Sequence, residues 1–288
     1  PSLVLILLAD VLSSSYQQAQ LNMGIFNPES ITIADLFLGA ILPGLILPIL
    51  YIIYLKSLKI KTVNNKLLNE KSNILSVIYP LSLMFIVLGS IIFGIATPSE
   101  AAGIGALGAI ILAYSQNNLS KIILDKCVFE SIKLTSMVFM ILIGAILFSL
   151  VFRGLEGEEF IHKFLVEMPD SKFMTLFIIL LIMFFLGFIL DFIEITFIVI
   201  PLIGPALFTL GFDPLWIGIL IALVLQTSFI TPPFGFSLFY LRGVLPKNVK
   251  TTEIYKGIIP FLIIQIFLVI VVFIFPDLAT ALPKILLK

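Results

Sequence analysis

Thr231-Pro232-Pro233-Phe234-Gly235 interrupts an otherwise apolar stretch at about 215–245 and decides how that stretch can fold. Proline has no backbone N–H group and disfavours helical geometry at the residue before it, so a helix that reaches this sequence has to break. Carbonyl groups near Gln226 to Ile230 are therefore expected to lose their helical partners. In a membrane, such carbonyls are tolerated only where protein buries them or where they line a cavity.

A hard cation such as sodium is a suitable partner for free carbonyls, because it prefers oxygen ligands. Neighbouring hydroxyl groups can complete the oxygen shell, so we expect sodium near Ser228 and Thr231. The alternative is a proline kink that neighbouring Ser and Thr side chains satisfy. The candidate ion- or substrate-binding residues of the break are Thr227, Ser228, Thr231, Pro232, Pro233 and Gly235.

The composition indicates that this break lies in a membrane protein. Of the 288 residues, 60% are apolar and only 12% are charged, against roughly 25% charged residues in soluble domains. The 17 basic residues balance the 17 acidic ones, which gives no indication of a nucleic-acid partner. Cys127 and His162 are the only cysteine and histidine, which excludes an internal disulfide framework and leaves little room for histidine-based catalysis.

The apolar runs and the charges between them predict a topology. Runs near the roughly 20 residues that span a bilayer lie at about 36–55, 75–95, 134–152 and 257–276. Weaker runs lie at about 98–114, which is rich in Gly and Ala, and at 173–190, 197–210 and 215–245. Excess lysine and arginine place three loops in the cytoplasm, at 56–74, 115–133 and 242–256. The acidic loops at 10–35 and 153–172 are predicted to be extracytoplasmic.

The segment at about 173–210 is predicted to be a re-entrant hairpin. Asp191-Phe192-Ile193-Glu194 separates its two apolar runs, and the second run is short and contains Pro201 and Pro205. Two full crossings would satisfy the same charge pattern and remain an alternative. A charge at membrane depth is costly unless it is paired, hydrated or bound to an ion, so Asp191 and Glu194 are candidate site residues. A loop that surfaces into water is the alternative.

The two ends of the chain carry related sequences. Asp35-Leu36-Phe37-Leu38-Gly39 and Glu253-Ile254-Tyr255-Lys256-Gly257 each precede a spanning run, but the loops before them have opposite charge. Inverted repeats of this kind are typical of secondary transporters, although a short motif can also match by chance. We therefore expect the end of a first repeat at 1–55, connecting helices at 56–133 and a second repeat at 134–288. The first repeat would lack its own hairpin and broken helix, which predicts a C-terminal portion of a longer chain.

Three ordered motifs resemble the large membrane subunit (M subunit, DctM type) of tripartite ATP-independent periplasmic (TRAP) transporters. They are Gly94-Ile95-Ala96-Thr97-Pro98-Ser99-Glu100-Ala101-Ala102, the Asp191 hairpin, and the Thr231 break with Leu238-Phe239. The opening Pro1-Ser2 resembles the end of the family's Pro-Pro-Ser element. Thr97, Pro98, Ser99 and Glu100 form the structural motif, in which Glu100 can also cap a helix start.

The resemblance implies an all-α polytopic protein of the bacterial cytoplasmic (inner) membrane with an elevator-type, inverted-repeat fold. It implies sodium-driven uptake of small organic acids, with sodium as coupling ion and no other cofactor. The implied partners are a small membrane subunit (Q-type) and a periplasmic solute-binding protein (P-type). By position, Asp191 matches the family's hairpin-tip acid, and Thr231, Pro232, Pro233 and Gly235 match its helix break.

The sequence departs from the family pattern at two places. Glu194 stands where dicarboxylate-type members often have proline, and Thr227-Ser228 replaces a common Ile-Gly. Together with Thr196, these departures resemble the subgroup labelled mannitol or chloroaromatic type, and Thr196 joins the candidate site residues.

Other classes of function remain as alternatives. The closest is a sodium-coupled dicarboxylate- or citrate-type transporter that needs no binding protein. A polytopic membrane enzyme would need paired aspartate motifs or clustered histidines, and neither is present in the sequence. A structural scaffold subunit explains the helices but not the acids and the diproline at membrane depth. A nucleotide-driven pump would need a Gly-rich phosphate loop, which this chain lacks.

Overall fold

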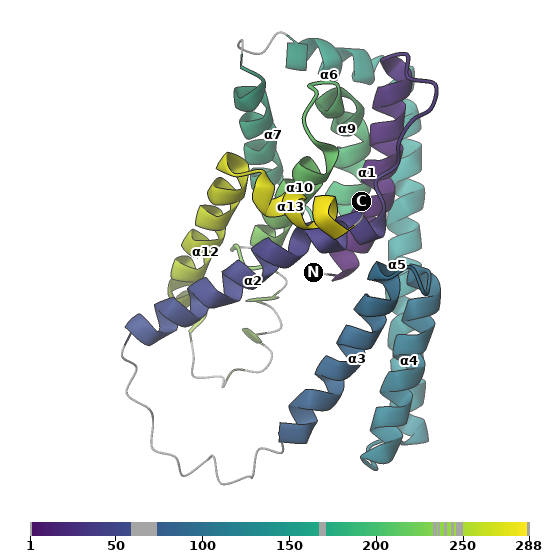
Figure 1. Ribbon diagram of the computed structural model, residues 1–288, viewed down its shortest axis with the longest axis vertical. Helices are drawn as coiled ribbons and strands as arrows, with labels where there is room; N and C mark the ends of the chain where they lie inside the picture. Colours follow the sequence, from purple (N-terminus) through teal and green to yellow (C-terminus); the bar gives the residue numbers. More distant parts are fainter. Residues whose placement is uncertain are drawn as a thin grey trace. The chain divides into compact units, whose positions relative to one another are not determined.

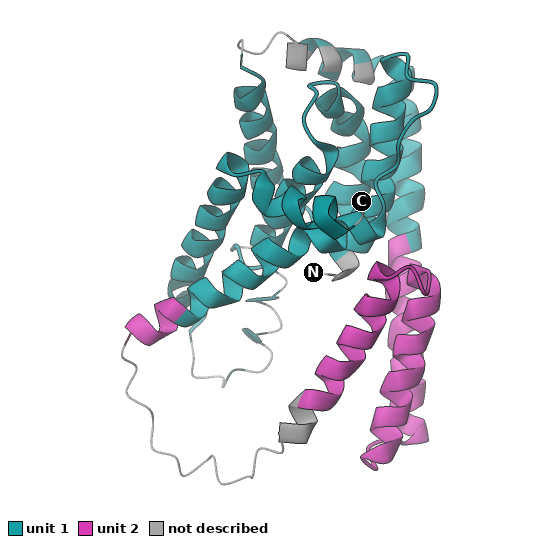
Figure 2. Cartoon of the chain, in the orientation of Figure 1, with its two compact units in different colours: residues 1–52, 139–288 teal, residues 53–138 magenta. Residues whose placement is uncertain are grey.

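The computed structural model describes residues 2–58, 74–166, 171–232 and 250–286, together with 235, 237, 238, 241, 242 and 245. Within these ranges the chain forms helices and turns, without any β-strand. It divides into two compact units, shown in Figure 2. Unit 1 comprises residues 1–52 and 139–288, and unit 2 comprises residues 53–138.

The helices of unit 1 come from both ends of the chain (Figure 1). They are α1 (Ser2–Asn22), most of α2 (Ile33–Ser57), the second half of α5 (Lys121–Gly154), α6 (Gly157–Val166), α7 (Lys172–Leu186), α8 (Phe192–Glu194), the π-helix η2 (Ile195–Val199), α9 (Ile200–Phe208), α10 (Pro214–Ser228), α12 (Thr251–Ile274) and α13 (Asp277–Leu286).

Helix α10 forms the core of unit 1. It packs against α1, α7, α8, α12 and α13, and most of its side chains are buried. Gly218 permits this close packing, because a Cβ atom there would lie 2.9 Å from side-chain atoms of both Leu12 and Leu36. Asp213 caps the start of α10 by accepting hydrogen bonds from the backbone N–H groups of Leu215 and Trp216.

Trp216 joins α10 to α12 through a buried hydrogen bond. Its indole Nε1 donates to the Val272 carbonyl over 2.8 Å. In a continuous helix this carbonyl would accept from the residue four positions later, but that residue is Pro276 and has no N–H group. Trp216 therefore donates to the Val272 carbonyl the hydrogen bond that Pro276 cannot donate.

Unit 2 contains α3 (Ile74–Ile92), α4 (Pro98–Ser115) and the first half of α5. Helices α3 and α4 pack together, because small residues of α4 let the two helices approach closely. A Cβ atom at Gly105 would lie 3.2 Å from Val87, and one at Gly108 would overlap Leu83. The Gly- and Ala-rich composition of this run thus serves close helix packing.

In the described part of the chain, four helices have an acid in their first turn that accepts a hydrogen bond from the backbone N–H group three residues earlier. Glu100 binds the Thr97 N–H group at the start of α4, and Glu194 binds that of Asp191 at the start of α8. The two acids of the sequence motif at the chain ends do the same, since Asp35 binds the Thr32 N–H group before α2 and Glu253 that of Lys250 before α12. Helix capping thus accounts for the acid in both motifs, while the inverted repeat stays a prediction.

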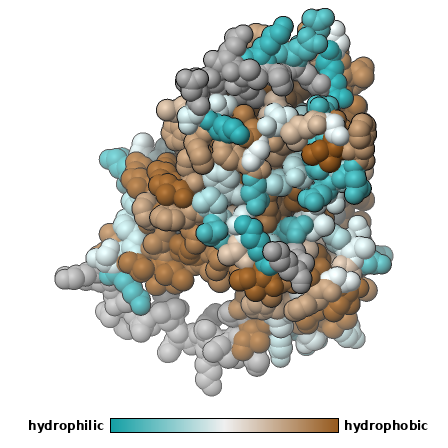
Figure 3. All heavy atoms as spheres, turned by 45° about the horizontal axis from the view of Figure 1, so that its top comes forward, coloured by the Kyte–Doolittle hydropathy of each residue, from teal (hydrophilic) through white to brown (hydrophobic). Residues whose placement is uncertain are grey.

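Among the described residues, three helices are long and apolar enough to cross a membrane, namely α2, α5 and α12. Large apolar side chains are exposed along them, such as Ile49 of α2, Met140 of α5 and Ile263 of α12. Apolar surface also covers broad areas of the face shown in Figure 3. Exposed apolar surface on this scale fits a lipid environment.

The structure differs from the predicted elements at several places. Helix α5 begins at Lys121, inside the predicted loop 115–133, and has 34 residues. At 1.5 Å per residue it exceeds the roughly 30 Å hydrocarbon thickness, so a charged end does not prevent a spanning helix. The predicted loops also contain most of α1, which ends at Asn22, and the amphipathic helix α6. The loop at 56–74 lies mostly outside the described residues.

We predict that Trp216→Phe destabilises unit 1. The change keeps an aromatic ring but leaves the buried Val272 carbonyl without its donor, which costs about 1–3 kcal/mol. Thermal unfolding of the purified protein in detergent measures the effect. An unfolding temperature equal to that of the parent would contradict a structural role for this bond.

Candidate functional site

The predicted hairpin consists of α7 and of a second arm formed by α8, η2 and α9. The first arm is Lys172–Leu186 and the second is Phe192–Phe208, and both are shorter than the three candidate spans. Helix α7 packs against α10, whereas α9 packs against α1 and α6 (Figure 1). Helix α8, at the tip between the arms, also contacts α10.

Asp191 and Glu194 cap the second arm at this tip. One carboxylate oxygen of Asp191 accepts from the Phe192 N–H group over 2.6 Å, and Glu194 accepts from the Asp191 N–H group over 3.2 Å. Both side chains are only partly buried. Both carboxyl groups lie at the N-terminal end of a helix that is very short before it changes to π geometry. The positive dipole at this end lowers the free-energy cost of placing negative charge there.

Thr196 brings buried oxygen atoms into the second arm. Its side chain is 0% exposed, and its hydroxyl has no hydrogen-bond partner among the described residues. The Thr196 carbonyl lacks the usual helical donors as well. The Ile200 N–H group donates to the carbonyl of Ile195, as in a π-helix, and not to that of Thr196. The next residue is Pro201, which has no N–H group to donate.

The hairpin tip contacts the end of α10 at two points. Gly187 lies against Ser228, because a Cβ atom at position 187 would overlap the Ser228 hydroxyl and lie 2.8 Å from its Cβ. The ring of Phe192 packs on that of Phe229, with 5.1 Å between the ring centroids. Two segments about 40 residues apart in sequence thus meet where α10 breaks.

The break itself is a tight turn. Beyond Ser228 the N–H groups of Phe229, Ile230 and Thr231 donate to carbonyls three residues back. The chain then reverses direction, so that the backbone N–H group of Ser237 donates to the Phe229 carbonyl. Gly235 is required there, since a Cβ atom would lie 2.8 Å from that same carbonyl oxygen. Pro233 and Phe234 lie outside the described residues.

The carbonyls before the break have more partners than the sequence led us to expect. Thr231 donates its hydroxyl to the Thr227 carbonyl over 2.6 Å, and Thr227 donates to Val224 over 2.6 Å. Ser228 also points its hydroxyl at the Val224 carbonyl, at 3.5 Å. The expectation of free carbonyls is therefore wrong for Gln226, Thr227, Ser228 and Phe229. Side chains, 3₁₀-type bonds and the backbone N–H group of Ser237 take the place of the lost helical bonds.

These hydroxyl groups can still bind a cation. A hydroxyl that donates its hydrogen keeps lone pairs on its oxygen, and Thr227, Ser228 and Thr231 are all buried. Among the described residues no group of three His, Cys, Asp or Glu side chains could hold a metal ion. The described oxygens thus suit a monovalent hard ion better than a divalent one, since they are mostly uncharged.

The structure brings most of the predicted site residues to one region of unit 1. Asp191 and Glu194 lie at the tip, Thr227, Ser228, Thr231, Pro232 and Gly235 lie at the break, and Thr196 lies one turn beyond the tip. Thr97, Pro98, Ser99 and Glu100 belong to unit 2, where they start α4. The sequence analysis missed Gly187 and the Phe192–Phe229 pair, which form the contact between tip and break.

Comparison with known proteins identifies the family of the chain. The family described as "Tripartite ATP-independent periplasmic transporter, DctM component" matches residues 21–278. The chain belongs to this family.

Its relatives include permeases with different named substrates. The C4-dicarboxylate TRAP transporter large permease protein DctM of Pseudomonas aeruginosa is 30% identical over 210 residues, which cover 72% of this chain and 48% of that protein. The sialic acid TRAP transporter large permease protein SiaM of Vibrio cholerae is 25% identical over 222 residues, covering 75% and 50%. The isethionate TRAP transporter permease protein DctMQ of Oleidesulfovibrio alaskensis is 26% identical over 242 residues, covering 82% and 38%.

This chain spans about half the length of the first curated relatives that it matches. None of the three names above contains the mannitol or chloroaromatic label, so that subgroup assignment stays a prediction.

We predict that Gly187→Ala separates the tip from the break. The added methyl group overlaps Ser228, and overpacking of this kind costs about 1–3 kcal/mol. Thermal unfolding should show the loss, and adding Ser228→Gly to the same chain should recover part of it. Gly257→Ala in α12 is the matched control, because no atom of the described residues lies within 4 Å of a Cβ atom there. Equal unfolding temperatures for Gly187→Ala and Gly257→Ala would contradict the contact.

Proposed function

We propose that this chain is part of the large permease subunit of a sodium-coupled secondary transporter that imports small organic acids. Membership of the DctM family supports a role in solute transport. The observation that carries the sodium proposal is the contact between the hairpin tip and the break in α10, which gathers buried hydroxyl oxygens beside a helix break.

The chemistry of the oxygens supports the proposal that sodium binds in this region. Ser228 and Thr231 offer lone pairs without burying negative charge, which avoids the cost of an unpaired carboxylate at membrane depth. Thr196 adds a hydroxyl and a carbonyl oxygen that lack the donors a helix normally supplies. Asp191 at the tip supplies one negative charge nearby, so an ion bound between tip and break would offset part of the desolvation of that carboxylate.

A re-entrant hairpin gives this site a movable wall. The first arm has 15 residues, and at 1.5 Å per residue it measures roughly 22 Å, short of the roughly 30 Å hydrocarbon core. An arm of this length enters a membrane without crossing it. In an inverted-repeat, elevator-type transporter, hairpins and broken helices move together against a scaffold, and we propose the same for unit 1.

The proposed partners are a small membrane subunit (Q-type) and a periplasmic solute-binding protein (P-type), in the bacterial inner membrane. The relatives' names mention C4-dicarboxylates, sialic acid and isethionate, which are all organic anions. A small organic anion is therefore the proposed substrate class, delivered at the extracytoplasmic face.

We predict that Thr196→Val and Thr231→Val each raise the sodium concentration for half-maximal uptake by about tenfold, which corresponds to about 1.4 kcal/mol. The measurement is substrate uptake against sodium concentration by the complete permease complex in liposomes, with Asp191→Asn as a third variant. Thr196→Val should leave the unfolding temperature unchanged, because the hydroxyl it removes has no partner among the described residues.

Thr280→Val is the matched control for this experiment. Thr280 is buried and donates its hydroxyl to the carbonyl four residues back, as Thr231 does, but it lies in α13. This variant should keep the parent's sodium dependence. If the Thr196, Thr231 and Asp191 variants all keep it too, the sodium site lies elsewhere and the break is a kink with satisfied carbonyls.

A further prediction concerns the solute-binding protein. Glu156 and Glu159 are exposed at the turn before α6 and at its start, and Glu158 lies beside them. Neutralising all three should raise the binding-protein concentration for half-maximal uptake and weaken its dependence on salt, because rim charges act mainly on association. Neutralising Asp125 and Glu130 of α5, on the predicted cytoplasmic side, should change neither. An unchanged salt series for the first variant would remove this loop from the interface.

A further inference from the structure

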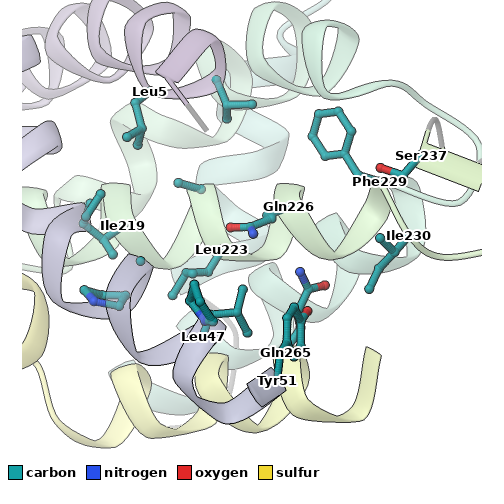
Figure 4. Close-up of a pocket in the computed structure, with 16 residues that line it drawn as sticks. Leu5, Leu47, Tyr51, Ile219, Leu223, Gln226, Phe229, Ile230, Ser237 and Gln265 are labelled. Carbon is teal, nitrogen blue, oxygen red and sulfur yellow. The ribbon is translucent and has the colours of Figure 1, made fainter. Parts of the chain in front are cut away.

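A cavity of about 460 Å³ lies between α2, α10 and α12, with the start of α1 and the break also in its wall (Figure 4). Cavities of about 300–1,000 Å³ commonly hold small-molecule ligands. Ile219, Leu223 and Gln226 line it from α10. At 100° per residue these three share one face of the helix, and Ser228, which contacts the hairpin, points from the opposite face. The cavity is therefore distinct from the proposed sodium site.

Its polar groups come from four separate segments. Gln226 of α10, Gln265 of α12, Tyr51 of α2 and Ser237 beyond the break all line it (Figure 4). Gln265 is only 6% exposed, and its side-chain carbonyl oxygen has no hydrogen-bond partner among the described residues. The Tyr51 side chain lies next to that amide in the lining (Figure 4). A buried amide with one unused edge is costly, so a ligand that completes it gains affinity.

The lining defines the chemistry of that ligand. Among its described residues there is no carboxylate, amine or guanidinium group. A charged ligand would therefore be buried without a counter-charge, which is strongly unfavourable. A hydroxyl group both donates and accepts hydrogen bonds, so it can pair with either edge of a glutamine amide. The remaining lining, such as Leu5, Leu47 and Ile219, is apolar and suits a hydrocarbon chain.

We propose that this cavity is a binding site for an uncharged amphiphile with a hydroxyl head group, held by Gln265 and Gln226. The occupant would contact Phe229, which also lines the cavity. The ring of Phe229 packs on Phe192 at the start of the hairpin's second arm. A ligand that moves Phe229 would therefore also move the hairpin tip. This site is not part of the proposed transport function, and a ligand bound there would regulate transport.

The test is photolabelling of the complete permease complex in lipid nanodiscs with a diazirine-bearing 1-octanol. Mass spectrometry then locates the label, which should concentrate on peptides containing Tyr51, Gln226 and Gln265. Unlabelled 1-octanol should compete at roughly tenfold lower concentration than octanoate or octane, since only the alcohol is both uncharged and able to hydrogen-bond. Monoolein is included as a second competitor, and stronger competition by monoolein than by 1-octanol would identify a membrane lipid with the same hydroxyl chemistry as the occupant.

Two variants separate the site from general partitioning into lipid. Gln265→Leu keeps the size of the side chain and removes the amide, so labelling of the cavity peptides should fall several-fold. Gln17→Leu, on α1 and outside the cavity lining, should leave it unchanged. Equal competition by octanoate, or equal labelling of parent and Gln265→Leu, would overturn the proposal. Labelling does not depend on sodium, so this result is independent of the uptake experiments.

Discussion

The contact between Gly187 and Ser228 is the constraint on which the proposed site depends. Only a residue without a side chain lets the hairpin tip lie against α10 at this point. The approach places the buried hydroxyls of the break beside the acid at the tip, although the two segments are far apart in sequence. It also seats Phe192 on Phe229, which ties the hairpin's second arm to the end of α10. A larger residue at position 187 would separate all of these groups together.

Much of this arrangement could be predicted from local sequence rules. The apolar runs predicted the helices that became α2, α3, α4, α5, α7, α10 and α12, because a span of about 20 apolar residues has few other solutions. Pro232 and Pro233 predicted the end of α10 near Ser228, since proline cannot continue a helix. Glu100 was recognised as a possible cap, and the same rule turns out to govern Asp35, Glu194 and Glu253.

The rest depends on contacts that no local rule contains. The carbonyl of Thr227 is satisfied by the hydroxyl of Thr231, a choice that only the geometry of the broken helix decides. The π-helix at Ile195–Val199 forms next to Pro201, but that proline also fits an ordinary α-helical start. Helix α6 was not predicted, because the charged residues of this segment indicated a loop. Gly187 gave no signal at all, as a single glycine in an apolar run has many explanations.

The division into two units has a spectroscopic consequence. The chain has one tryptophan and one cysteine. Trp216 is buried in the core of unit 1, whereas Cys127 is exposed on the part of α5 that belongs to unit 2. A fluorescent acceptor attached to that thiol would quench the indole emission to a degree set by the separation of the units. The natural sequence thus provides a donor and a labelling position for following relative motion of the two units, without introducing either residue.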